Sequence, residues 1–213
     1  MHFLSDDLEL YIEQHSENEP ELLTQLNKET YQKILLPRMC SGHFQGRVLS
    51  MLSKLIRPIN ILEIGTFTGY AALCLCEGML PDGQLHTIDI KEELVDFQRK
   101  YFNKSGFGPQ IHQHLGEAIN VIPTLDLKFD LVFIDADKEN YINYYHLILP
   151  KMNKGGIILS DNVLWSGKVV EPLQKNDIST QILLEYNLLL KSDSRVETVL
   201  LPIRDGLTVS RVL

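Results

Sequence analysis

From residue 60 onwards, short runs of β-branched and aliphatic residues alternate with segments whose apolar positions recur every three to four residues. The runs lie near residues 61–64, 85–88, 111–114, 131–134 and 157–160, with helices expected near 70–79, 92–105, 117–122 and 140–149. Parallel strands require crossover connections, so this alternation predicts an α/β fold in which helices cover both faces of a parallel sheet.

The two ends of the chain extend this pattern. An amphipathic segment at 178–191 precedes two strands near 196–201 and 207–212, joined by a short link that contains Asp205 and Gly206. Asp-Gly favours a tight turn, so these strands are expected to pair antiparallel and to make the sheet mixed. Apolar patterns after Ser5, Pro20 and Gly42 indicate three further helices. We expect one domain over 1–213, with a helical cover at 1–57 and a Rossmann-like core at 58–213.

Charge and composition narrow the function classes. The 213 residues carry a net charge of -8, which disfavours a broad basic surface for nucleic acid. No apolar run is long enough to span a bilayer, and the first residues lack the pattern of a secretory signal. The three cysteines, Cys40, Cys74 and Cys76, are expected to be reduced core residues. We therefore expect a cytoplasmic protein with no membrane partner.

A glycine turn follows the first core strand and indicates a nucleoside site. Glu63, Gly65 and Gly69 have the spacing E-x-G-x-x-x-G, not the G-x-G-x-x-G that binds a dinucleotide pyrophosphate. S-adenosylmethionine has no pyrophosphate but carries an ammonium, for which Glu63 offers an acceptor. Asp89 ends the second strand, where a carboxylate can accept both ribose hydroxyls. Ala118, after the third strand, is placed to meet the adenine edge.

Oxygen-bearing side chains follow the next two strands. Asp135, Asp137 and Lys138 follow the central strand, and Asp161 and Asn162 follow its expected neighbour. Two carboxylates and one amide oxygen, from Asp135, Asp161 and Asn162, suit Mg²⁺ or a similar ion such as Mn²⁺ or Ca²⁺.

Such an ion favours a particular acceptor. Two neighbouring hydroxyls can chelate it, which stabilises the alkoxide of a phenol-like group whose pKa is otherwise about 10. Lys138 is placed to take the hydroxyl proton. The methyl group then passes directly from sulfonium to oxygen, without a covalent enzyme intermediate.

Three segments together resemble the cation-dependent class I O-methyltransferases, a family that includes caffeoyl-CoA and catechol O-methyltransferases. They are residues 61–70 (ILEIGTFTGY), 133–138 (FIDADK) and 160–167 (SDNVLWSG), and the likeness runs from about residue 36 to 213. The resemblance implies a seven-stranded sheet with a reversed last strand, a homodimer and a small catechol-type acceptor.

The resemblance also implies roles for individual residues. Asp135, Asp161 and Asn162 would bind the metal, Asp135 would touch the acceptor hydroxyls, and Lys138 would be the base. Ser166, just after Trp165, falls where relatives meet the substrate. The contacts implied for S-adenosylmethionine are Met39, Ser41, Glu63, Gly65, Thr66, Asp89, Ala118, Asp135 and Asp137.

This chain departs from the plant members of the family at two places. Ala71 stands where they commonly carry a serine that binds the cofactor, so that contact would be lost or pass to the backbone. His43, Phe44 and Gln45 stand where they carry a small residue and two acids, which puts a coenzyme A ester in doubt and makes His43 a candidate at the edge of the substrate site.

Three other functions compete with a small-molecule O-methyltransferase. A tRNA hydroxyuridine O-methyltransferase would use the same chemistry, but the acidic net charge disfavours it. An NAD-binding oxidoreductase is disfavoured by the missing G-x-G-x-x-G and by the Asp161-Asn162 pair. A catalytically silent S-adenosylmethionine-binding module ranks last, because every expected catalytic residue type is present.

Overall fold

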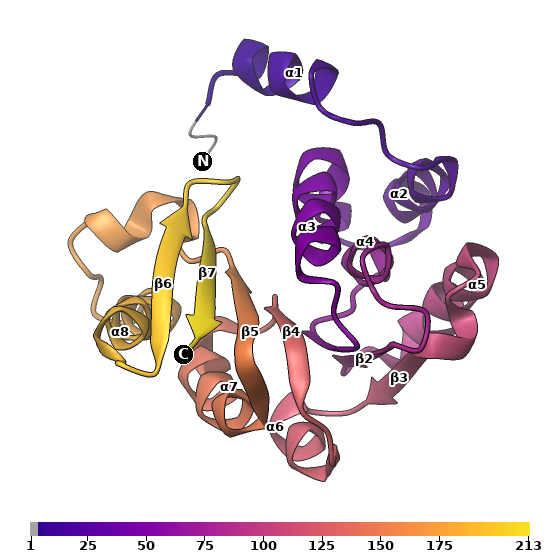
Figure 1. The fold of residues 1–213 in the computed structure, drawn as a ribbon. Helices are drawn as coiled ribbons and strands as arrows, with labels where there is room; N and C mark the ends of the chain where they lie inside the picture. The colour runs from indigo at the N-terminus through magenta and orange to yellow at the C-terminus, as the bar shows by residue number, and fades with distance from the viewer. Residues whose placement is uncertain (1–3) are drawn as a thin grey trace.

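The computed structural model describes residues 4–213, which form a seven-stranded sheet in the order β3-β2-β1-β4-β5-β7-β6 (Figure 1). Strand β7 runs antiparallel to both of its neighbours, β5 and β6, whereas strands β1 to β5 are parallel to one another. The predicted α/β fold, with a mixed sheet and a reversed last strand, is confirmed. The strands are β1 (Asn60–Ile64), β2 (Gln84–Asp89), β3 (Ile111–Leu115), β4 (Phe129–Ile134), β5 (Met152–Asp161), β6 (Val196–Leu201) and β7 (Leu207–Val212).

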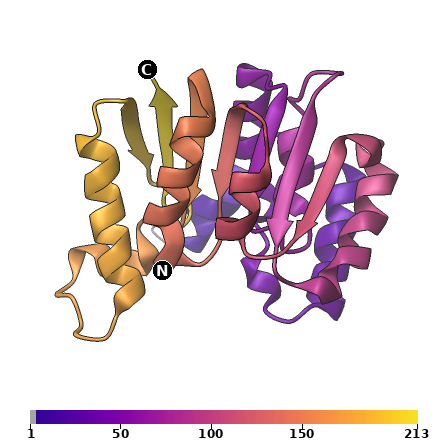
Figure 2. The same cartoon turned by 90° about the horizontal axis from the view of Figure 1, so that it is seen from below.

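Helices lie on both sides of the sheet (Figure 2). The first five helices of the chain are α1 (Asp6–Gln14), α2 (Glu21–Lys33), α3 (Gly42–Ile56), α4 (Tyr70–Cys76) and α5 (Val95–Ser105). The others are α6 (Ala118–Val121), α7 (Tyr141–Ile148) and α8 (Ile178–Ser192). Helix α1 stands away from the sheet, while α3 packs against α4 (Figure 1).

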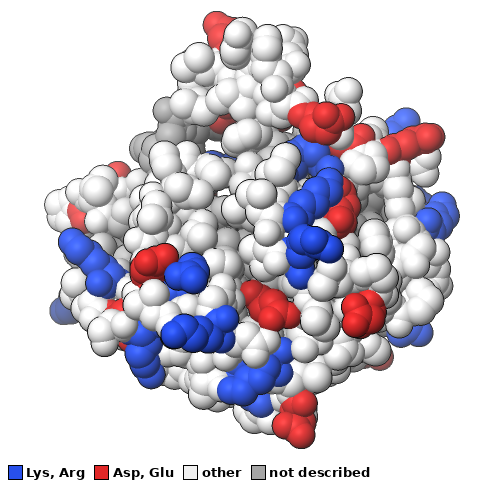
Figure 3. Space-filling model, viewed as in Figure 1, with Lys and Arg blue, Asp and Glu red and all other residues white. Residues whose placement is uncertain are grey.

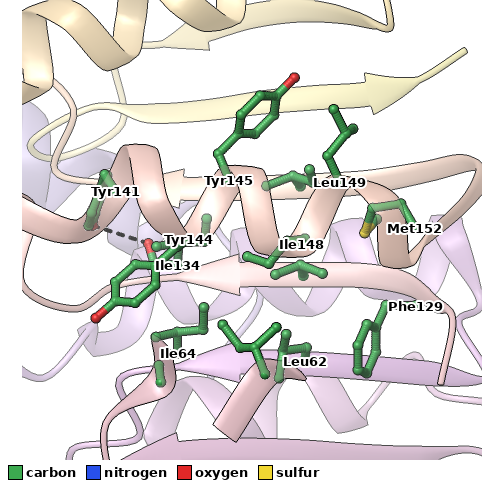
Figure 4. Packing of buried hydrophobic residues seen from close by; sticks show 14 of the residues in the cluster. Leu62, Ile64, Phe129, Ile134, Tyr141, Tyr144, Tyr145, Ile148, Leu149 and Met152 are labelled. Atoms are coloured by element: carbon green, nitrogen blue, oxygen red, sulfur yellow. Dashed lines mark hydrogen bonds between the residues drawn. The ribbon is translucent and has the colours of Figure 1, made fainter. Parts of the chain in front are cut away.

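Each face of the sheet has its own hydrophobic core. On one face, Leu62 and Ile134 meet Tyr144 and Ile148 of α7 (Figure 4). On the other face, Ile61 and neighbouring strand residues pack against α2, α3, α4 and α5. Because side chains alternate along a strand, the buried run at residues 131–134 of β4 supplies both cores.

Two elements differ from the sequence-based expectation in length. Strand β5 begins at Met152, several residues before the expected start, although Gly155 has a φ of +81° and the pairing with β4 is irregular between Phe129 and Leu131. A glycine-containing irregularity of this kind lets a strand continue through a segment whose composition indicates a turn. Helix α4 ends at Cys76, earlier than expected, and residues 77–79 form a turn.

The parallel strands place their C-terminal ends at one edge of the sheet. Ile64, Asp89, Ile134 and Asp161 are the last residues of β1, β2, β4 and β5. In open α/β sheets, ligands bind beyond this edge. Within the described residues, no helix is both long enough and apolar enough to cross a bilayer.

Candidate active site

A cavity of about 680 Å³ opens at the C-terminal edge of the sheet. It is lined by the turns after β1, β2, β4 and β5 and by the segment that precedes α3. Ten of the residues predicted from sequence line it, namely Met39, Gly65, Asp89, Ala118, Asp135, Asp137, Lys138, Asp161, Asn162 and Trp165. Their convergence makes this cavity the candidate site.

The turn after β1 brings the backbone unusually close to the end of β4. Gly65 has a φ of +98°, and a Cβ atom built on it would lie 1.9 Å from the carbonyl oxygen of Asp135. Only glycine avoids both the backbone strain and this clash. The glycine turn therefore sets the floor of the cavity between β1 and β4.

Asp89 braces the same turn from β2. Its Oδ2 accepts a hydrogen bond from the backbone N–H of Phe67 at 2.7 Å, and its Oδ1 accepts one from the N–H of Lys91 at 3.0 Å. Each carboxylate oxygen has a second lone pair. Because Asp89 also lines the cavity, that remaining capacity can serve a ligand's hydroxyls.

Glu63 lies beneath the turn, fully buried, and does not line the cavity. Its Oε2 accepts a hydrogen bond from the hydroxyl of Thr87 at 2.5 Å, whereas its buried Oε1 has no hydrogen-bond partner among residues 4–213. Burial, together with the negative charges of Asp89 and Asp135, raises the pKa of Glu63 to about 8. An unsatisfied buried acceptor of this kind fits a ligand ammonium.

The oxygen atoms of Asp135 and Asn162 converge on one cationic group. The ammonium of Lys138 lies 3.4 Å from Asp135 Oδ1 and 2.9 Å from Asn162 Oδ1, and it also donates to the hydroxyl of Tyr141 at 2.6 Å. The two strand ends therefore bring these side chains together, as the sequence predicts.

Asp161 is the most deeply buried of the proposed metal ligands, with 2% of its surface exposed. Its Oδ1 accepts from the backbone N–H of Asn162 at 2.8 Å and its Oδ2 from Gln45 Nε2 at 2.6 Å. Burial, and then the nearby charge of Asp135, raise the pKa of Asp161 well above its usual range. The negative charge of Asp135 near the buried Asp161 favours a positive charge at this place.

The loop after β5 carries backbone strain. Asn162, Trp165 and Ser166 have φ values of +58°, +49° and +54°, a region that non-glycine residues rarely adopt. Trp165 lines the cavity, and its ring centroid lies 5.9 Å from the Lys138 ammonium. Ser166 is exposed and does not line the cavity; its backbone N–H donates to Asp205 Oδ1 at 2.5 Å.

Four other predicted residues do not line the cavity. Ser41 is buried, and its carbonyl accepts a hydrogen bond from the guanidinium of Arg204. Thr66 and Ala71 are buried, in the glycine turn and in the first turn of α4. His43 is turned towards the N-terminal segment, where its Nε2 lies 2.7 Å from the carbonyl oxygen of Glu17.

Several residues that line the cavity, or that contact its lining residues, were not predicted from the sequence. Arg38, Arg204 and Asp205 line the cavity, and the hydroxyl of Tyr144 donates to Asp137 Oδ1 at 2.5 Å. Gln45 contacts Asp161 across 116 residues of chain. A distance in sequence of that size leaves no local pattern. Tyr144 could have been found, because it follows Asp137 by two helical turns.

Comparison with known proteins assigns the family. A family model described as O-methyltransferase matches residues 13–213. A relative from Arabidopsis thaliana, caffeoyl-CoA O-methyltransferase 1, is 34% identical over 220 positions, covering 97% of this chain and 85% of the relative.

Solved structures agree with this assignment. The S-adenosylhomocysteine-bound methyltransferase PaMTH1 of Podospora anserina superposes with a TM-score of 0.88 and 29% identity, covering 98% of this chain and 94% of that one. The O-methyltransferase TomG of Streptomyces achromogenes, solved with S-adenosylmethionine, superposes with a TM-score of 0.90 and 28% identity, covering 97% and 96%. With the family model spanning nearly the whole sequence, this chain belongs to the O-methyltransferase family.

Proposed function

We propose that this enzyme transfers the methyl group of S-adenosylmethionine to one hydroxyl of a small vicinal dihydroxy, catechol-type acceptor, with the help of a divalent cation. The observation that carries the proposal is the convergence of Asp135 and Asn162 on one cationic group beside the buried carboxylate of Asp161. This cluster lies in the same cavity as the glycine turn and Asp89, so the acceptor and the cofactor would meet there.

The cofactor half of the proposal rests on both likeness and geometry. TomG was solved with S-adenosylmethionine and PaMTH1 with S-adenosylhomocysteine. In this chain, Asp89 lines the cavity and would accept from the ribose hydroxyls. Glu63 lies beneath the turn, so its free Oε1 would accept from the cofactor's ammonium after that turn shifts. Ser41, Thr66, Ala71, Ala118 and Asp137 would shape the remainder of the cofactor site, and Met39 would cover it.

The cation half rests on the chemistry of the donors. Carboxylate and amide oxygens are the ligands that Mg²⁺, Mn²⁺ and Ca²⁺ prefer, and Asp135, Asp161 and Asn162 supply three of them. No group of three or more His, Cys, Asp or Glu side chains in residues 4–213 could hold a metal, so the Asn162 amide is essential to the proposed set. A bound cation would stabilise a deprotonated hydroxyl and orient a chelating diol.

Lys138 is the proposed base. Its nitrogen contacts Asp135 and Asn162, so an acceptor hydroxyl bound against those oxygens would lie within its reach. Trp165 would flank the acceptor, because it lines the cavity. Ser166, in the loop after β5, and His43, in the first turn of α3, are proposed to act at the edge of the site.

The acceptor is proposed to be small, because the cavity that would hold it together with the cofactor has a volume of about 680 Å³, within the range of sites for small molecules. On the face in Figure 3, acidic and basic side chains are interspersed, and the net charge is -8, which gives no support to a tRNA acceptor.

A methyl-transfer screen tests the proposal. Catechols, flavonoids, coenzyme A esters and tRNA would each be offered with labelled S-adenosylmethionine, in Mg²⁺ and in a chelator. We expect transfer to a catechol in Mg²⁺ and its loss in the chelator. Transfer to tRNA alone would overturn the acceptor assignment.

A pair of variants tests whether turnover depends on the proposed cation. Asp161→Ala is expected to abolish metal-dependent turnover while leaving most of the S-adenosylmethionine affinity, because it removes one proposed ligand. Asp82→Ala, at an exposed position outside the cavity, is the matched control. Full activity of Asp161→Ala in a chelator would refute the metal assignment.

We also propose a homodimer in which the N-terminal helices take part. Leu8, Leu10 and Tyr11 of α1 and Leu55 of α3 are large apolar side chains that are more than half exposed. Apolar surface of this kind on neighbouring helices is typical of an interface. Light scattering after size exclusion would give the mass, and a monomer at micromolar concentration would contradict the proposal.

A further inference from the structure

The side chains of Gln45 and Arg204 form a hydrogen-bonded chain that ends on Asp161. Gln45, on α3, is 1% exposed and donates from Nε2 to Asp161 Oδ2 at 2.6 Å. Its Oε1 accepts from Arg204 Nη1 at 2.7 Å. These contacts span 116 and 159 residues of sequence and join α3, the end of β5 and the turn between β6 and β7.

The chemistry of the three groups leaves one orientation for the amide. A carboxylate can only accept and a guanidinium can only donate, so the group between them must do both. Glutamine does this without adding charge. Its N–H therefore faces Asp161 and its oxygen faces Arg204, and Asp161 Oδ2 is held in one direction while its second lone pair remains available.

Arg204 also holds the segment that leads into α3. Its Nη1 donates to the carbonyl of Ser41 as well as to Gln45. Arg204 has a φ of +48°. A non-glycine residue in this region indicates that the surrounding contacts enforce the turn.

The neighbouring residue extends the same turn to the loop after β5. The backbone carbonyl of Asp205 accepts from the N–H of Leu164 at 2.9 Å, and its side chain accepts from the N–H of Ser166. The turn at 204–205 thus touches both the segment before α3 and the loop that carries Asn162 and Trp165.

We infer that Gln45 and Arg204 are positioning residues that orient Asp161 for the cation and tie the segment over the cavity to that carboxylate. This inference rests on the proposed function, because it assigns Asp161 to the cation. Neither residue needs to touch the acceptor or the cofactor. Partners that hold a metal ligand in place typically change metal affinity about 10- to 100-fold when they are replaced.

The first measurement is the affinity of the full chain for Mn²⁺ in the presence of S-adenosylhomocysteine. The EPR signal of the unbound ion reports how much Mn²⁺ remains free. Gln45→Leu should weaken Mn²⁺ binding about tenfold or more, because it removes the donor to Asp161. Arg204→Met should weaken it about fivefold, and Arg204→Lys should restore part of the loss.

Controls separate positioning from general damage. Arg38→Met changes a cation that lines the same cavity but is not part of the chain of contacts, so its Mn²⁺ affinity should stay within about twofold of the parent. S-adenosylmethionine affinity in a chelator should also stay within about twofold in Gln45→Leu, which leaves the contact between Arg204 and Ser41 in place. Thermal unfolding identifies any variant that fails to fold. If Gln45→Leu fails to fold, the comparison of Arg204→Met with Arg204→Lys tests the inference.

A second readout does not involve a metal. Trp165 is the one tryptophan of the chain and lies in the loop after Asp161. In a chelator, acrylamide quenching of its fluorescence should increase about twofold in Gln45→Leu and Arg204→Met, because the loop loses its anchor, and should not change in Arg38→Met.

Mn²⁺ affinity and Trp165 quenching together distinguish failure of the positioning role from failure of the proposed cation. If Gln45→Leu binds Mn²⁺ as the parent does and its Trp165 quenching is unchanged, the positioning role is wrong. If the parent chain binds no Mn²⁺, the cation of the proposed function is wrong, and the quenching in chelator still decides whether Gln45 and Arg204 hold the loop.

Discussion

The ammonium nitrogen of Lys138 lies 2.9 Å from the side-chain oxygen of Asn162, although 24 residues separate the two along the chain. They meet because β4 and β5 are parallel neighbours whose C-terminal ends share one edge of the sheet. Lys138 is 7% exposed and also contacts Asp135 and Tyr141. A buried lysine held by three oxygen atoms is well placed to act on whatever binds to those oxygens.

Replacing this lysine should affect turnover more than cofactor binding. In Lys138→Met the side-chain volume is kept but the nitrogen is lost, so we expect kcat to fall about 100-fold, the usual contribution of a general base. The affinity for S-adenosylmethionine, measured by calorimetry, should change little. Lys91→Met, at another lysine that lines the cavity, is the control and should retain kcat. A Lys138→Met enzyme with the parent rate across pH 6 to 9 would remove Lys138 from the base role.

The glycine turn makes a prediction about stability. Gly65→Ala would place a Cβ 1.9 Å from the Asp135 carbonyl at a φ of +98°, so the free energy of unfolding should drop by about 3 kcal/mol or more. Gly42→Ala is the matched control, because Gly42 also has a positive φ, of +74°, but no atom lies within 4 Å of the added Cβ. Its cost should be about 1 kcal/mol, from backbone strain alone. Urea unfolding followed by Trp165 fluorescence would give both values, and equal losses would contradict the close approach.

The fold could be predicted because its information is local. Residues 131–134 of β4 are an uninterrupted, buried apolar run, and the apolar positions of the helices between strands repeat with a period of three to four residues. The start of β5 could not be predicted, because Gly155 and Gly156 have the composition of a turn, whereas the strand runs on through them across an irregularity in its pairing with β4.

The candidate site was predicted where it depends on strand ends and missed where it depends on tertiary contacts. Asp135 and Asp161 each follow a recognisable strand, so parallel pairing alone brings them together. Gln45 lies on a helix whose pattern indicates only an apolar face, and Arg204 lies in a turn. Nothing in either segment specifies the other, and their meeting is decided by how α3 packs on the sheet.

Acid stability should depend on a histidine cluster at the edge of the sheet. His86 is buried next to His112 and His114, and its Nδ1 lies 2.9 Å from His114 Nε2. Burial first, and then the two neighbouring imidazoles, lower the pKa of His86 to about 4. Histidines of the unfolded chain titrate near pH 6.5. Between about pH 6.5 and 4, the unfolded chain therefore binds a proton at His86 that the folded chain does not bind.

This difference in proton uptake sets the direction in which stability changes with pH. The free energy of unfolding should fall as the pH drops from 7 towards 4.5, with His86 accounting for about 2 kcal/mol of the loss. His86→Gln removes this titration and should flatten the dependence, as measured by urea unfolding at several pH values. His146→Gln, at an exposed position on α7, should leave the slope as it is. Equal slopes for the two variants would show that His86 is not responsible.

Glu63 makes the affinity for S-adenosylmethionine depend on pH. Its carboxyl is fully buried, and burial raises its pKa to about 8, so the apo enzyme holds it protonated at pH 6 to 7. An ammonium paired with Oε1 requires the carboxylate, so binding in this range must release a proton. The affinity should therefore rise with pH between 6 and 7.5, by up to about tenfold per pH unit.

Calorimetry in phosphate and in an amine buffer, with a chelator present, would count the released protons from the difference in apparent enthalpy. Glu63→Gln keeps the side-chain size but cannot ionise, so its affinity should be weaker and flat over the same pH range. Asp137→Asn serves as the comparison, because Asp137 lines the cavity but is exposed. If the parent chain binds S-adenosylmethionine with no proton release, Glu63 does not pair with the ammonium, and its buried Oε1 must be satisfied in another way.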